Sequence, residues 1–215
     1  MTYLDIIQDR EIMAIYSRID ILKQDEPKHY GIIHVLSTIE YARQLAECFE
    51  LNIKERSLLF IACALHNIGH LNGKTLHAQT GAEMAKGYLR KNNIPSEDVK
   101  VIGSAIASHT GRRGDNFYDN VSACLILADK MDFGSTRIKP YFEPLDEESK
   151  ICKQITSVSV TRKDNTVELW LGGENVDWRS FVGSSIYSKM YRCFEIVCKK
   201  HSLKFVAKIK KLGVK

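Results

Sequence analysis

The stretch LLFIACALHN, residues 58–67, decides how this chain folds, because eight consecutive apolar residues lead directly into a histidine and an asparagine. A helix that is apolar on nearly all sides is central and buried. We therefore expect the helix over residues 53–67 to form the middle of a helical bundle. An imidazole buried at its end without partners would cost about 1 to 3 kcal/mol, so His66 must bond to another group.

Helical periodicity extends on both sides of this stretch, and the first 133 residues are predicted to be helix after helix. The residues Ile33, Leu36, Tyr41 and Leu45 are predicted to form the apolar side of the second helix. Helices are expected over residues 4–23, 30–50, 53–67, 77–91, 96–109 and 119–133, with loops at 68–75 and 110–118.

The periodicity changes in the last third of the chain. Residues 157–161 and 167–171 alternate between apolar and polar side chains around a short turn, which predicts a β-hairpin. An amphipathic helix over 179–201 and a basic strand over 203–210 follow. The fold class is therefore mainly α, a helical bundle over residues 1–150 with a small C-terminal α+β (β-β-α-β) appendix over 151–215.

Composition excludes several classes of protein. The chain of 215 residues is 44% hydrophobic and 27% charged, with 4 prolines and 13 glycines, which is typical of a globular protein and excludes collagen-like or disordered chains. No apolar run reaches the roughly 18 to 20 residues of a membrane span, and the charged N-terminus does not resemble a signal peptide. We expect a cytoplasmic protein that does not bind membranes, with its six isolated cysteines reduced.

Positive charge is concentrated at the C-terminus. The net charge is +5, and residues 199–215 contain seven lysines and no acid, so the rest of the chain is slightly negative. Such a segment is typical either of a nucleic-acid-binding tail or of a solvated edge strand, on which lysines also discourage aggregation. We favour the edge strand and expect no nucleic-acid partner.

Five of the seven histidines lie between residues 34 and 109, at or near the ends of predicted helices. A bundle that brings these ends together would form a pocket with several imidazoles, the Asn67 amide and the Asp129 carboxylate. Imidazole and carboxylate together suit first-row divalent ions. The candidate residues are His34, His66, Asn67, His77, His109 and Asp129.

This series resembles the HD-domain superfamily of metal-dependent phosphohydrolases. The strings ALHNIGH and HAQTGAEMAKGYL are similar to the family's "LLHDIGH" and "H-x-x-x-GAE-x-A" segments, and AIASHTGR and LILADKMD are similar to its "AI-x-x-H" and "LADK-x-D" segments. The resemblance covers about residues 30–133. It implies an HD-type bundle that hydrolyses a phosphate ester or anhydride.

The resemblance also implies the metal ligands. In the family's pattern His34, His66 and Asp129 would hold one divalent transition metal ion (Mn, Fe, Zn, Ni or Co). Position 67 would bridge to a second ion held by His77 and His109. A short match around residues 109–112 to HD-domain diadenosine tetraphosphatases implies a phosphorylated small molecule, a nucleotide, as substrate.

Asn67 departs from the family's pattern, which has aspartate at this position. A neutral amide bridges two cations poorly, so we expect one tightly held metal and a second that is weak or absent. Loss of the carboxylate also weakens the activation of water. Two outcomes stay open: a working hydrolase, or a degenerate HD domain that binds a metal or a phosphorylated ligand without catalysis.

Further polar residues flank these motifs. Lys74, Arg112, Arg113 and Lys130 are candidates for holding phosphate oxygens. Lys130 directly follows Asp129 and is expected to point to another side of its helix. His70 is a candidate outer-shell acid or phosphate contact, with a surface position as the alternative. The sequence does not decide whether the chain forms a homo-oligomer.

Overall fold

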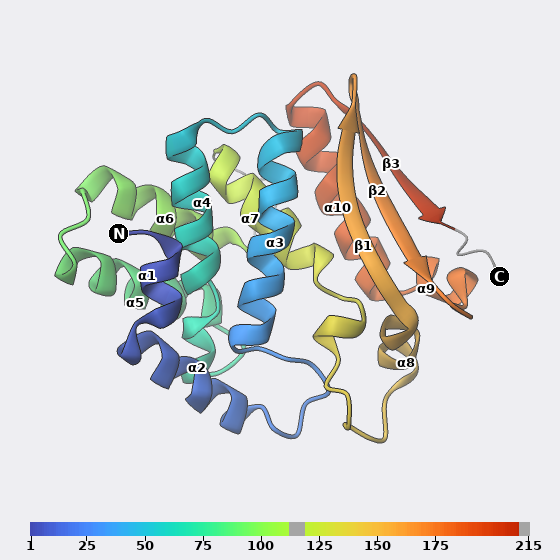
Figure 1. Ribbon diagram of the computed structural model, residues 1–215, viewed down its shortest axis with the longest axis horizontal. Coiled ribbons are helices and arrows are strands. Elements are labelled where there is room, and N and C mark those ends of the chain that lie inside the picture. Colours follow the sequence, from blue (N-terminus) through green and yellow to red (C-terminus); the bar gives the residue numbers. More distant parts are fainter. Residues whose placement is uncertain (112–118, 211–215) are drawn as a thin grey trace.

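The computed structural model describes residues 1–111 and 119–210, which form a helical bundle beside a small sheet (Figure 1). The prediction of a mainly α fold with a C-terminal α+β appendix is confirmed. The bundle consists of α1 (Tyr3–Gln8), α2 (Arg10–Leu22), α3 (Ile32–Cys48), α4 (Ile53–Leu65), η1 (Ile68–Asn72), α5 (His77–Lys91), α6 (Ser96–Ser108) and α7 (Asn120–Met131). After it come η2 (Ser135–Arg137), α8 (Glu147–Gln154), β1 (Ile155–Lys163), β2 (Thr166–Gly173), α9 (Trp178–Val182), α10 (Ser185–Lys200) and β3 (Lys204–Lys210).

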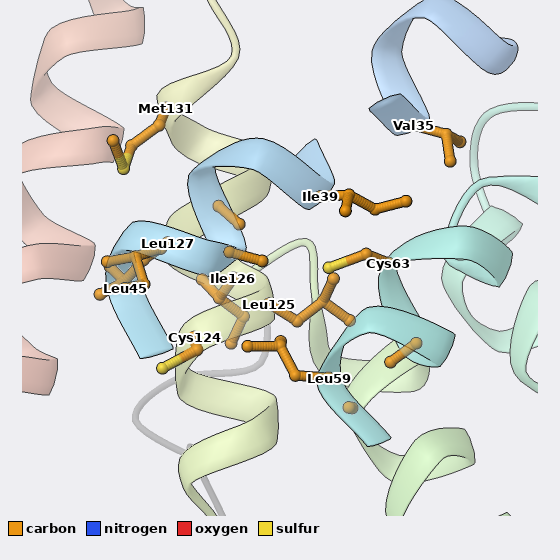
Figure 2. Close-up of a cluster of buried hydrophobic side chains, with 14 of the residues drawn as sticks. Val35, Ile39, Leu45, Leu59, Cys63, Cys124, Leu125, Ile126, Leu127 and Met131 are labelled. Carbon is orange, nitrogen blue, oxygen red and sulfur yellow. The ribbon is translucent and has the colours of Figure 1, made fainter. Parts of the chain in front are cut away.

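The central helix is α4, as the apolar stretch predicts. It packs against α1, α3, α6 and α7, and Leu59, Cys63 and Leu65 are fully buried. Figure 2 shows side chains of α3, α4 and α7 pointing toward one another in this core. A reciprocal cap between Asn52 and Glu55 starts α4, which satisfies backbone donors at its first turn. At its other end, Leu65 and His66 are fully buried, so α4 ends inside the bundle.

The predicted apolar side of α3 is right at Tyr41 and Leu45, which pack in or against the core, and wrong at Ile33 and Leu36. Ile33 and Leu36 are each nearly half exposed, whereas His34 and Thr38 are fully buried. The Thr38 hydroxyl donates to the backbone oxygen of His34 at 2.8 Å, which lets a polar side chain sit in the core. Polar residues therefore occupy positions on the buried face that a hydrophobic pattern assigns to the surface.

Two helices expected as single segments are interrupted. Asp9 adopts an extended backbone and accepts hydrogen bonds from Glu11 and Ile12, so α2 starts anew after α1. Ser184 caps α10 in the same way through the backbone N–H of Tyr187. The short helices η1 and α8 were not expected. Each interruption has a side chain that caps a helix N-terminus, which stabilises the new start.

The sheet of the appendix has the order β1-β2-β3, with β1 and β2 antiparallel and β2 and β3 parallel. The edge of β1 faces α3, where the backbone N–H of Val160 donates to Gln44 Oε1 at 3.0 Å and Arg162 donates to the backbone oxygen of Cys48. β3 is the other edge, as predicted, and its lysines lie along it. The helix α10 packs against both α7 and β3.

Buried apolar side chains form one continuous cluster from Ile6 to Cys198. The expected boundary at residue 150 falls inside α8, and the division into two domains stays a prediction. All six cysteines are free and buried, as expected. Within the described residues, every helix is too short or too polar to cross a membrane.

Candidate metal centre

The chain brings the candidate ligands together from five helices. His34 lies in the first turn of α3, and His66 directly follows α4. His77 is the first residue of α5, His109 directly follows α6, and Asp129 lies near the end of α7. All four histidines are buried. The helix ends that the sequence marks with histidine therefore do converge.

The first cluster consists of His34, His66 and Asp129. The two Nε2 atoms are 2.9 Å apart, and Asp129 Oδ1 lies 3.3 Å from Nε2 of His34 and 3.8 Å from Nε2 of His66. These ligand atoms all lie within 4.8 Å of one another. Two imidazole nitrogens and a carboxylate oxygen around one point are a donor set for a divalent transition metal.

Hydrogen bonds on the far side of each ring orient the rings of this cluster. His66 Nδ1 donates to the backbone oxygen of Cys63 at 2.8 Å, so its Nε2 presents a lone pair. His34 Nδ1 lies 2.6 Å from Asp132 Oδ2. The Nε2 atoms of His34 and His66 and Oδ1 of Asp129 face one another, and a proton or a cation between them offsets their repulsion. The donor set therefore fits a metal ion.

The second cluster consists of His77 and His109, whose Nε2 atoms are 3.1 Å apart. Their Nδ1 atoms donate to the backbone oxygens of Lys74 at 2.8 Å and Ile106 at 2.6 Å. Metal-binding histidines commonly make such second bonds, which orient the ring. The ring centroid of His109 lies 5.1 Å from that of His66, so the two clusters are neighbours.

A close approach between η1 and α5 holds these clusters together. A Cβ added to Gly69 would collide with the backbone oxygen of His77 and the backbone nitrogen of Gly81. Only glycine therefore lets η1 lie on the first turns of α5. His70 then stacks on His77, with ring centroids 4.0 Å apart.

His70 is buried, which excludes the alternative of a surface position. It lines a cavity that lies beside the two histidine clusters and is described below. Its Nδ1 has no hydrogen-bond partner in the described residues. Burial, reinforced by the neighbouring His77, lowers the pKa of His70 to about 3. The ring is therefore neutral at pH 7.

Charge in the centre is set mainly by Asp129. Burial alone would raise the pKa of its carboxyl, but Lys130 and the neighbouring His109 and His66 together hold it below its ordinary value. Burial lowers the pKa of His66 and, more strongly, that of His109. Burial and the neighbouring Asp129 raise the pKa of Asp132 to about 8. At neutral pH His66 and His109 are therefore neutral and Asp129 is ionised, the protonation states that metal binding requires.

The sequence predicts that Lys130 points to another side of its helix than Asp129, and this prediction is wrong. Its ammonium folds back to Asp129 Oδ2 at 2.5 Å. The long, flexible stem of lysine allows this return along the helix surface. Asp129 thus offers Oδ1 to the histidines while Oδ2 is paired with Lys130.

Asn67 is buried at the wall of the cavity. Its amide Nδ2 donates to the backbone oxygen of Tyr30 at 3.0 Å. Because the amide nitrogen is fixed in this bond, Oδ1 is the atom that remains as an acceptor. An aspartate with the same side-chain position would place an oxygen against the carbonyl of Tyr30.

A cavity of about 430 Å³ opens beside both clusters. Cationic side chains from several elements reach it, and Lys74 is among them, paired with Glu26 at 3.6 Å. Arg112 and Arg113 lie outside the described residues. The cavity is lined by Tyr30, Asn67, His70, Lys74, His77, His109, Thr110, Gly111, Asp129, Lys130, Arg137, Lys189 and Arg192.

Sequence reasoning missed Asp132 and Arg137. Asp132 is buried and orients His34, and Arg137 Nη1 lies 3.3 Å from its Oδ2. Asp132 could have been found, because it follows Asp129 by three residues and so lies on nearly the same side of the chain. Nothing in the sequence around Arg137 marks it as part of the site.

Two comparisons with known proteins bear on these residues. The profile of the family described as HD domain matches residues 31–159, more than half of the chain. No curated protein matches the chain. The matched range contains both histidine clusters and Asp129, and it ends within β1. This protein therefore belongs to the HD domain family, a superfamily of metal-dependent phosphohydrolases.

Proposed function

We propose that this protein hydrolyses a phosphate ester or anhydride in a phosphorylated small molecule, a nucleotide, with a divalent transition metal at His34, His66 and Asp129. The observation that carries the proposal is the convergence of two imidazole nitrogens and a carboxylate oxygen beside a cavity with cationic walls. A pocket of this size accommodates a small ligand.

A divalent ion held there would polarise a phosphoryl oxygen and make water more acidic. The protein's own groups would do the rest. Lys130 and Arg137 line the cavity and would offset the negative charge that develops on the phosphoryl oxygens. His70, neutral at pH 7, would donate a hydrogen bond to the substrate rather than a charge.

Asn67 would act through its amide oxygen. It lines the cavity next to His70 and His77, and its amide nitrogen is held by Tyr30. The oxygen can accept a hydrogen bond from a nearby water and orient it, but it carries no full charge. We therefore propose one tight metal ion and a second, weaker one at His77 and His109.

The test is turnover of the full chain, stripped with chelator and resupplied with Mn²⁺, on p-nitrophenyl phosphate and on nucleoside mono-, di- and triphosphates. We expect Mn²⁺ to restore hydrolysis, and Asp129→Asn to lower it at least about a hundredfold, because a ligand and its charge are lost. Metal content is measured on both proteins. Equal turnover of the stripped and the loaded protein would refute the proposal.

A second function is favoured by Asn67 alone: a module that binds a metal and a phosphorylated ligand without hydrolysing it. The amide lacks the charge that would bridge two cations. In that case the loaded protein would bind nucleotides, with affinity that Asp129→Asn lowers, while no substrate of the panel is turned over.

A further inference from the structure

One wall of the cavity comes from outside the part of the chain that the HD domain profile matches. Lys189 and Arg192 of α10 line it, whereas the matched residues end at 159. The two residues are three apart on one helix, so their side chains leave the same face. The appendix therefore completes a site whose other groups come from the bundle.

These two cations differ from those of the bundle in their pairing. Lys130 is paired with Asp129, Arg137 with Asp132, and Lys74 with Glu26. In the described residues, neither Lys189 nor Arg192 has an ion pair, and both side chains are exposed. Within the described residues, no acid therefore competes with a ligand for either cation.

A second, smaller cavity adjoins the larger one. Its volume is about 180 Å³, and it shares Asp129, Lys130, Arg137 and Lys189 with the larger cavity. It adds Lys28, Asp132, Phe133 and Ile186. Lys189 therefore lies where the two cavities meet.

The helix α10 holds the backbone of this pair beside the cavity. Its opposite face buries Met190, Phe194 and Val197, and the helix packs against α7, which carries Asp129. Ser184 caps its first turn. The backbone therefore needs no rearrangement when an anion binds, and only the two side chains lose freedom.

We propose that Lys189 and Arg192 form an anion subsite that binds a second phosphoryl group of the substrate. The first phosphoryl group lies at the histidine centre, where Lys130 serves it. The substrates preferred by this protein therefore carry two or more linked phosphoryl groups. This specificity rests on the proposed function, but the subsite itself is a binding site and is tested as one.

The test compares binding of pyrophosphate and orthophosphate to the metal-loaded full chain by titration calorimetry. The variant is Lys189→Gln/Arg192→Gln. The matched control is Lys199→Gln/Lys204→Gln, which removes the same charge from exposed residues that line neither cavity. Metal content is measured in all three proteins, so that a lost metal is not mistaken for a lost subsite.

We expect the variant to bind pyrophosphate at least about tenfold more weakly, because two charge-assisted contacts are lost. Its affinity for orthophosphate should change by less than about threefold, and the control should resemble the wild type for both anions. Pyrophosphate binding that is equal in variant and wild type would overturn the subsite. An equal loss in variant and control would show bulk charge attraction only and would overturn it too.

Turnover separates this inference from the proposed function. If the protein hydrolyses phosphate compounds, the variant should lose kcat/KM on a nucleoside diphosphate, mainly through KM, and keep it on p-nitrophenyl phosphate. If no compound is hydrolysed, the proposed function fails while the pyrophosphate result still stands for the subsite. Equal losses on both substrates would contradict the proposed specificity.

Discussion

The two histidine clusters resemble each other in geometry and differ in charge. In both, two Nε2 atoms face each other at about 3 Å, and a backbone oxygen or a carboxylate orients each ring. The His34–His66 cluster has Asp129 beside its nitrogens and Asp132 behind one ring. The Nδ1 atoms of His77 and His109 donate to the backbone oxygens of Lys74 and Ile106.

The difference in charge between the two clusters indicates which of them binds a metal ion more tightly. Neutral imidazoles supply lone pairs, but a carboxylate also neutralises part of the charge of the ion. The His34–His66 cluster should therefore bind metal strongly, and the His77–His109 cluster weakly. Asn67 follows His66 and precedes His77 in the chain. Its neutral amide supplies no charge that would raise the metal affinity of the second cluster to that of the first.

The largest expected effect comes from removing one histidine of each cluster. His34→Ala reduces three ligands to two, and we expect the metal content of about one ion per chain to fall close to zero. His77→Ala should leave it nearly unchanged. Elemental analysis after dialysis checks both variants at equal folded fraction. Equal metal loss in the two variants would remove the distinction between the clusters.

Gly69→Ala should disturb both clusters at once. The added Cβ would collide with the backbone of His77 and Gly81, and overpacking of this kind costs up to about 3 kcal/mol. Urea denaturation of the stripped protein measures the loss. Gly87→Ala is the matched control, because it lies in α5 with open space around it and should raise stability by up to about 1 kcal/mol. A stable Gly69→Ala protein would show that η1 can move away freely.

Asp132→Asn tests the charge behind the first cluster. The amide keeps an oxygen beside His34 Nδ1 but cannot ionise. The Asp132 carboxyl, whose pKa burial raises to about 8, can ionise and then raises the basicity of the ring. Outer-shell changes of this kind typically cost about 10- to 100-fold in metal affinity, and competition with a chromophoric chelator measures it. The Nδ1 atoms of His77 and His109 bond to backbone oxygens and not to Asp132, so the weaker site should not respond.

Asn67→Asp should make the clusters more alike. A carboxylate would attract a second ion, and we expect about two metal ions per chain and hydrolysis faster by about tenfold, or 1.4 kcal/mol of barrier. Asparagine and aspartate have similar volumes, but the structure indicates that the substitution also lowers the stability of the fold. The hydrogen bond to the Tyr30 carbonyl is lost, so the stripped variant should be less stable by about 1 to 3 kcal/mol.

Metal content, turnover and urea stability of Asn67→Asp are measured beside wild type. Turnover that falls while metal content stays unchanged would show that the amide is an adaptation to this protein's substrate. A stripped variant as stable as wild type would show that the Tyr30 bond contributes little.

The smallest effect is a pH slope in the stripped protein. Burial holds the pKa of His109 well below its ordinary value, so below about pH 6.5 the unfolded chain binds a proton that the folded chain does not. Stability is therefore lost as pH falls, by up to about 1.4 kcal/mol per pH unit for this residue. His109→Gln should show a shallower slope between pH 6.5 and 5 in urea denaturation. Identical slopes would contradict the assignment.

Much of the fold follows from periodicity in the sequence. The apolar stretch before His66 predicts the central position of α4, and the alternation after residue 155 predicts the hairpin. The whole apolar side of α3 could not be predicted in this way. His34 occupies a core position through a hydrogen bond with the distant Asp132, and Thr38 through a bond to the backbone of the preceding turn. The break at Asp9 depends on a capping side chain within an otherwise helical pattern.

The site was predictable where residues lie in short motifs and not where they meet only in three dimensions. The histidines and Asp129 carry recognisable spacing. Lys189 and Arg192 lie on a helix that looks merely amphipathic in the sequence, and only the packing of α10 on α7 brings them to the cavity. The return of Lys130 to Asp129 depends on a side-chain rotamer, which sequence spacing does not specify.

The parallel pairing of β2 and β3 constrains how this protein can change over evolutionary time. Parallel neighbours cannot be joined by a tight turn, so the chain must travel back along the sheet, and α10 lies on that return path. A deletion that removed Lys189 and Arg192 would therefore also detach an edge strand. Lys189 and Arg192 can each be replaced by substitution. A deletion that shortened the chain here would be selected against because it would also disturb folding.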